Sequence, residues 1–89
     1  MMSLLVLGGG SQKNKTWVDE CASFFRHDFS DVNKIYYEHW RTGEKDIDFE
    51  LEMKKISSLL AGKEITELYV CAKSIGSILA LKCIEKGII

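Results

Sequence analysis

The sequence has no proline and only three cysteines, and neither sign of charge dominates it. Twelve basic and thirteen acidic side chains leave a net charge of −1, so no basic surface for nucleic acid or an anionic membrane is predicted. Cys21, Cys71 and Cys83 are an odd number at wide spacings, which indicates neither a disulfide framework nor a zinc site. Because each lies in an apolar segment, we interpret all three as reduced core residues of a cytoplasmic protein.

Long hydrophobic runs are also missing. Residues 4–7 form the first apolar segment, far short of the roughly 20 residues that cross a bilayer. No basic stretch precedes them, so neither a signal peptide nor a membrane span is expected. The 89 residues, 46% of them hydrophobic, suffice for one small domain with one core, which we place at residues 1–89.

Three short apolar segments are predicted to be strands. Residues 4–7 (LLVL) are apolar throughout and stop at glycine, as buried parallel strands do. Residues 32–40 contain the β-branched and aromatic run IYY, and residues 68–72 (LYVCA) form the third strand. Residues 88–89 would open a fourth.

Amphipathic segments between these strands are predicted to be helices. Thr16 is expected to cap the first, with Asp19 three residues on, and Asp46 or Asp48 to cap the second. On the second helix the charged residues are expected to form a solvated face: Glu50, Glu52, Lys54 and Lys55.

Glycines follow two of the predicted helices. Gly62 ends the second helix, and Gly87 ends a third at residues 75–85. Strands that alternate with helices predict a short parallel sheet with helices on both faces, a three-layer α/β/α fold.

The turn between the third strand and the third helix carries the most chemical information. Its residues are Ala72, Lys73, Ser74, Ile75 and Gly76. They approximate the nucleophile-elbow pattern G-x-S-x-G, with alanine in place of the first glycine; the tight backbone requires small residues at both ends. Ser74 would attack an acyl carbon, and the amide of Ile75 would stabilise the oxyanion.

The glycine run after the first strand is the natural source of a second oxyanion donor. Gly9, Gly10 and Ser11 lie at the carboxyl end of a strand expected beside the Ser74 strand. For the two turns to meet, the strand at residues 4–7 must lie between the other two.

Together, LLVLGGGS and ELYVCAKSIGSILALKCIEKG resemble the α/β-hydrolase superfamily in its small serine-hydrolase forms, over nearly the whole chain. The resemblance implies a truncated α/β-hydrolase-like core and hydrolysis of a small-molecule ester, thioester or amide through an acyl-enzyme. It implies neither a cofactor nor a metal.

The sequence departs from that family where the triad should be completed. The family's acid and histidine follow the serine, but only Glu85 follows Ser74, and His27 and His39 precede it. The chain is therefore expected to be a fragment of a serine hydrolase or a reduced relative. Either oligomerisation or residues beyond Ile89 would cover the edges of its sheet.

Other interpretations stay open at this point. Ser74 could simply cap a helix, and the glycines could simply end a strand. Residues 9–16 match a P-loop except for Asn14 in place of its second glycine, but no later strand ends in the aspartate that a Walker B motif needs. A dinucleotide fingerprint fits less well, because Lys13 stands at its third glycine. A non-catalytic scaffold is a further alternative. We interpret His39 as structural.

Overall fold

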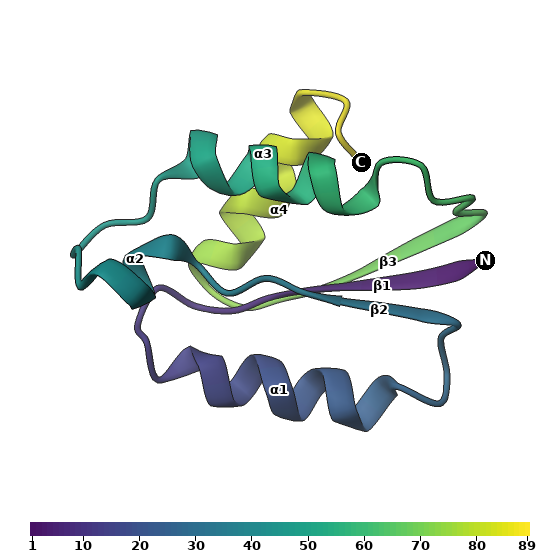
Figure 1. Cartoon of the computed structure of the whole chain (residues 1–89), viewed down its shortest axis with the longest axis horizontal. Helices are drawn as coiled ribbons and strands as arrows, with labels where there is room; N and C mark the ends of the chain where they lie inside the picture. The colour runs from purple at the N-terminus through teal and green to yellow at the C-terminus, as the bar shows by residue number, and fades with distance from the viewer.

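A three-stranded parallel sheet organises the computed structural model, which describes residues 1–89 (Figure 1). Four helices surround it. In chain order the elements are β1 (Met2–Leu7), α1 (Asn14–Phe25), β2 (Asp31–Lys34), α2 (Glu38–Thr42), α3 (Phe49–Leu60), β3 (Glu67–Ala72) and α4 (Ile75–Glu85).

The strand order is β2-β1-β3, and both pairings are parallel. Leu4 pairs with Val32 on one side and with Tyr69 on the other. The predicted parallel sheet with the first strand at its centre is thereby confirmed. All three strands end at the same edge, where the two turns singled out in the sequence lie.

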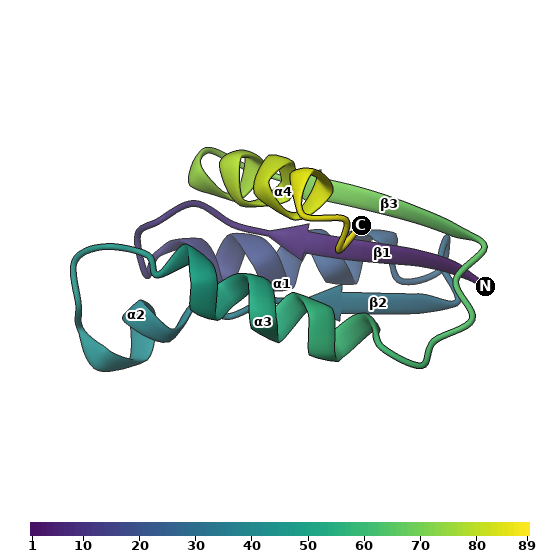
Figure 2. The ribbon, with the colours of Figure 1, turned by 90° about the horizontal axis from the view of Figure 1, so that it is seen from above.

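Helices cover both faces of the sheet, as predicted. Helix α1 lies on one face, and α3 and α4 lie side by side on the other, with α4 beside β3 (Figures 1 and 2). β1 is therefore buried on both faces, and residues 3–7 are all buried, which is why its sequence is apolar without alternation. β3 is an edge strand with Tyr69 and Val70 exposed.

Helix α3 begins where the sequence indicated, because the Asp48 side chain accepts a hydrogen bond from the Leu51 amide at 3.1 Å. The prediction for the first helix was wrong. α1 begins at Asn14, and Thr16 lies inside it and caps nothing. Asp19 instead accepts hydrogen bonds from Lys34 and Tyr36.

The second strand is much shorter than residues 32–40. β2 ends at Lys34, and α2 begins at Glu38. Tyr37 is buried, and its hydroxyl donates to Gly8 O at 2.7 Å. The aromatic run resembles a strand in composition, but Tyr37 holds the loop after β1, and Tyr36 donates to Asp19 of α1.

Two further expectations need correction. Glu52 is not solvated but fully buried, where it accepts a hydrogen bond from the Glu38 amide at 2.9 Å. Residues 88–89 form no strand, since the Ile88 amide folds back on Cys83 O at 2.8 Å. Cys83 lies in the core, whereas Cys21 and Cys71 are only half-buried; all three are free.

None of the helices is long and apolar enough to span a membrane.

Candidate active site

Ser74 has an unusual backbone conformation at the junction of β3 and α4. Its φ of 53° and ψ of −123° make it the one non-glycine residue with positive φ, and such a conformation costs a side-chain-bearing residue on the order of 1–3 kcal/mol. An ordinary N-cap serine has extended dihedrals and accepts a hydrogen bond from the helix. Ser74 has no such side-chain bond and is exposed. The simple capping interpretation therefore does not describe it.

The turn is forced into this shape by close contact with the end of β1. A Cβ built on Gly76 would lie 2.7 Å from Gly8 O and closer still to Leu7 O, so no larger residue fits there. On the other side of the turn, the Lys73 amide donates to Leu7 O at 3.0 Å. The serine is thus held by backbone contacts that need glycine at position 76, while Ala72 is accommodated at the strand end.

The loop after β1 offers unused backbone donors next to this turn. The amides of Gly9, Gly10 and Ser11 donate to no acceptor in the protein. The Ile75 amide, at the first position of α4, has no intrahelical acceptor. Gly10 faces the Ile75 side chain, since a Cβ on it would lie 3.7 Å from Ile75 Cγ2. The predicted backbone donors therefore come from two segments that lie against each other.

Three side chains that follow β2 hold the carbonyls of this loop. The Tyr37 hydroxyl donates to Gly8 O, and Gly10 O contacts both His39 Nε2 at 2.5 Å and Trp40 Nε1 at 2.9 Å. Burial and, secondarily, the charge of Glu52 raise the pKa of Tyr37, so its hydroxyl remains a donor at ordinary pH. Because C=O and N–H lie on opposite sides of a trans peptide, holding Gly10 O turns the Ser11 amide away from α2.

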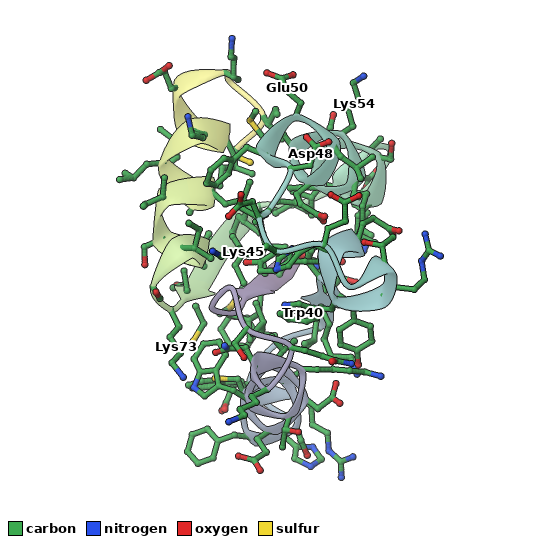
Figure 3. The ribbon with its side chains drawn as sticks, turned by 90° about the vertical axis from the view of Figure 1, so that its left-hand side faces the viewer. Trp40, Lys45, Asp48, Glu50, Lys54 and Lys73 are labelled. Atoms are coloured by element: carbon green, nitrogen blue, oxygen red, sulfur yellow. The ribbon has the colours of Figure 1, made fainter.

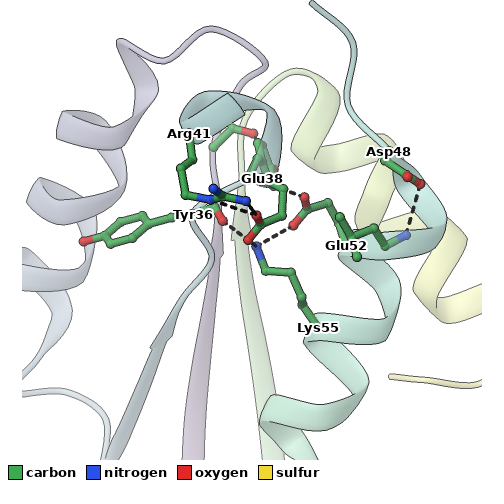
Figure 4. Close-up of polar contacts among 9 residues, drawn as sticks. Tyr36, Glu38, Arg41, Asp48, Glu52 and Lys55 are labelled. Atoms are coloured by element: carbon green, nitrogen blue, oxygen red, sulfur yellow. Dashed lines mark hydrogen bonds and ion pairs between the residues drawn. The ribbon is translucent and has the colours of Figure 1, made fainter. Parts of the chain in front are cut away.

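A polar network fixes the segment from which these three side chains come (Figure 4). Glu52 of α3 binds the Glu38 amide, and Lys55 donates to Tyr36 O at 2.5 Å. The Lys55 ammonium lies 3.0 Å from Glu52 Oε1 without hydrogen-bond geometry, and 3.4 Å from Glu38. Arg41 also pairs with Glu38, at 2.9 Å. The charged side chains of α3 thereby hold the start of α2, and His39 and Trp40 of α2 in turn bond to the glycine loop.

The sequence did not lead us to predict that Tyr37, His39 and Trp40 hold this loop. Tyr37 and Trp40 have the composition of core or strand residues, and only the positions of Gly8 O and Gly10 O reveal their hydrogen bonds. The glycine run itself could have indicated these hydrogen bonds, because the backbone carbonyls of a loop packed against the core need hydrogen-bond donors from other segments.

Neither histidine is placed to serve Ser74. His39 is buried, its Nε2 is bonded to Gly10 O, and its Nδ1 has no partner. His27 follows α1 at the opposite end of the sheet, where the strands begin (Figure 1). Glu85 ends α4, about three helical turns from the serine. Neither a histidine nor Glu85 is therefore placed beside Ser74 within these 89 residues.

The surface around Ser74 is open. Five hollows are present, and Ser74 lines none of them. One of about 210 Å³ borders the glycine loop on the side of His39 and Trp40. Figure 3 views this end of the molecule and shows Trp40 and Lys73 there. No group of three or more histidine, cysteine or acidic side chains is arranged to hold a metal ion.

The residues of the P-loop alternative have other contacts. Asn14 is the first residue of α1, and its side chain donates to Ser11 O at 3.0 Å, while a Cβ on Gly9 would lie 2.8 Å from Asn14 Oδ1. The Lys15 ammonium lies 5.1 Å from the centre of the Tyr36 ring, not over the glycine loop as phosphate binding would require.

Comparisons of the chain with models of protein families, with curated protein sequences and with solved structures found no match.

Proposed function

We propose that this chain carries the nucleophile and oxyanion-binding part of a serine hydrolase site, with Ser74 as the nucleophile. The carrying observation is the conformation of Ser74, which has positive φ although its side chain caps no helix. Backbone strain in a residue whose side chain makes no local capping bond is typical of functional positions. The substrate would be a small ester, thioester or amide, and the protein would act in the cytoplasm, as expected from its sequence.

The proposed reaction begins with attack of Ser74 Oγ on the acyl carbon and loss of its proton to a base. The negative charge on the carbonyl oxygen would be stabilised by the Ile75 amide and by an amide from residues 9–11, which are free of protein acceptors. Collapse of the tetrahedral intermediate would release the leaving group and leave Ser74 acylated. Water would then hydrolyse that acyl-enzyme.

The missing base determines how much esterase activity we expect from these 89 residues alone. Without it Ser74 keeps its proton near neutral pH and is a poor nucleophile. We therefore expect little or no turnover of activated esters by this chain. Ester turnover at the rate of an ordinary esterase that Ser74→Ala abolishes would contradict the assignment of an incomplete triad.

External imidazole tests the assignment of the nucleophile, because it supplies the absent base. The chain is incubated with p-nitrophenyl acetate and imidazole, and the acetylated residues are located by peptide mass spectrometry. We expect Ser74 to be acetylated in preference to Ser77, an exposed serine in the first turn of α4, and Ser77→Ala to leave that acetylation unchanged. Equal acetylation of Ser74 and Ser77 in the folded chain would overturn the proposal.

A further inference from the structure

Two of the free cysteines lie close together between helix α1 and the sheet face that α1 covers. Cys21 of α1 and Cys71 of β3 are 50 positions apart in sequence, yet their sulfur atoms lie 3.6 Å from each other. Both side chains are half-buried, so small oxidants can approach them. Cys83 is buried in α4, on the other face.

The position of this thiol pair is determined by packing on both sides of it. Toward the carboxyl end of β3, the Lys73 ammonium lies 5.6 Å from the centre of the Trp17 ring of α1. Toward the other end, Tyr69 of β3 packs edge-on against Phe29 at 5.3 Å between ring centres. Contacts on either side of the pair thus hold α1, through Trp17, and the loop that follows it, through Phe29, against β3.

We propose that Cys21 and Cys71 form an oxidation site, at which a peroxide converts the two thiols into a disulfide that joins α1 to β3. The inference is independent of the proposed hydrolase function. It uses neither Ser74 nor the glycine loop.

The reaction balances in two steps. A Cys71 thiolate attacks one oxygen of the peroxide, so that an S–O bond forms, the O–O bond breaks and water leaves after protonation. The Cys21 sulfur then attacks the Cys71 sulfenic acid, so that the S–S bond forms and the S–O bond breaks with release of a second water. With hydrogen peroxide as the oxidant, two thiols are oxidised and one molecule of peroxide is reduced to two waters.

The surroundings of Cys21 predict slow oxidation at neutral pH. Burial, followed by the neighbouring Cys71 thiol, raises the pKa of Cys21 to about 11. Since the thiolate is the nucleophile, the raised pKa of Cys21 slows its attack on the Cys71 sulfenic acid at neutral pH. The rate of disulfide formation should rise as the pH is raised.

Peptide mapping after oxidation tests the proposal. The reduced chain is treated with hydrogen peroxide, residual thiols are alkylated, and the disulfides are identified by mass spectrometry. We expect a Cys21–Cys71 crosslink within one molecule, which is lost in Cys21→Ser and Cys71→Ser and kept in Cys83→Ala. Closure of a loop of 50 residues should also raise the Tm, by on the order of 10 °C.

Oxidation of the chain unfolded in urea is the matched control. Without the fold, the pair nearest in sequence is Cys71 and Cys83, so a Cys71–Cys83 crosslink should dominate there. The proposal is overturned if the folded chain forms chiefly crosslinks to Cys83 or crosslinks between molecules. It is also overturned if both thiols of the folded chain remain free when the unfolded chain is fully oxidised.

Discussion

Ser74 is held in a conformation that glycine adopts more readily than serine. Its φ of 53° stores strain that Ser74→Gly would release, while glycine also makes the unfolded chain more flexible. We expect Ser74→Gly to raise the free energy of unfolding by about 1 kcal/mol in urea titrations. Ser74→Ala is the control and should leave stability nearly unchanged, because the hydroxyl makes no hydrogen bond to the helix. A loss of stability in both variants would argue against strain at this position.

The glycines on the two sides of the proposed site should differ sharply in their tolerance of a methyl group. Gly76→Ala places a Cβ against Leu7 O and Gly8 O, and we expect it to lower the free energy of unfolding by about 3 kcal/mol. Gly10→Ala meets only Ile75 Cγ2, at an ordinary 3.7 Å, and should be tolerated. Thermal melts of the two variants, compared with the unchanged chain, measure this contrast. Equal effects would show that the α4 turn can move away from β1.

At the scale of elements, a carboxylate ties β1, β2 and the segment after α3 together. Asp31 accepts hydrogen bonds from Ser3, Asn33 and Lys63 at 2.8–3.1 Å. Burial acts to raise the pKa of Asp31, but the hydrogen bonds from Asn33, Lys63 and Ser3 outweigh it and lower the pKa. A lowered pKa means that the charged form contributes stability above the ordinary carboxyl pKa, and that this contribution disappears as the pH falls through the lowered value.

Asp31→Asn should therefore destabilise the protein at neutral pH by about 1 kcal/mol and change little in acid. Urea unfolding followed from about pH 5 to about pH 2 should show the two chains converging. Asp46→Asn is a suitable control, because Asp46 is exposed and should behave like the unchanged chain throughout. A stability difference that persists in strong acid would show that Asp31 acts through packing rather than charge.

The elements differ in how far the sequence predicted them. Helix α4 has the predicted bounds, because Ser74 with its positive φ precedes it and Gly87, with a φ of 74°, follows it. The end of β2 and the whole of α2 were missed, since Tyr36 and Tyr37 have the composition of strand residues but bind Asp19 of α1 and Gly8 O of the glycine loop. The burial of Glu52 could not be predicted from helical periodicity either, because its partner is the Glu38 amide of a different element.

At the scale of the whole molecule, β3 has a free edge, and both β3 and α4 carry exposed apolar side chains. Val70 of β3 is exposed, as are Leu81 and Ile84 of α4. Lys82 of α4 lies over Phe49 of α3. Because successive residues of a helix are about 100° apart around its axis, Leu81 and Ile84 point in directions other than that of Lys82. An edge strand with such neighbours favours pairing with another chain.

A second copy can pair with this edge in a self-complementary register. The Lys73 amide donates to Leu7 O of β1, so by alternation the backbone groups of Val70 point to the free edge. A two-fold axis at Val70 would align the two strands antiparallel and place Glu67 opposite Lys73 of the other copy, an attractive pair.

We therefore expect the 89-residue chain to dimerise in a concentration-dependent manner in sedimentation velocity experiments. Val70→Lys should keep it monomeric, and Glu67→Lys should weaken the dimer until Lys73→Glu is added. Leu51→Lys, an exposed change on α3, should not alter association. A chain that stays monomeric at all concentrations would contradict this prediction.

The central place of β1 also bears on how the protein is made. β1 leaves the ribosome before either of its partners, and the order β2-β1-β3 leaves one of its sides unpaired until β3 has been synthesised. During that interval a strand whose residues 3–7 are all buried in the finished fold presents backbone and apolar side chains to the cell. Translation that pauses between β2 and β3 would lengthen that exposure, and the nascent chain would then depend most on chaperones.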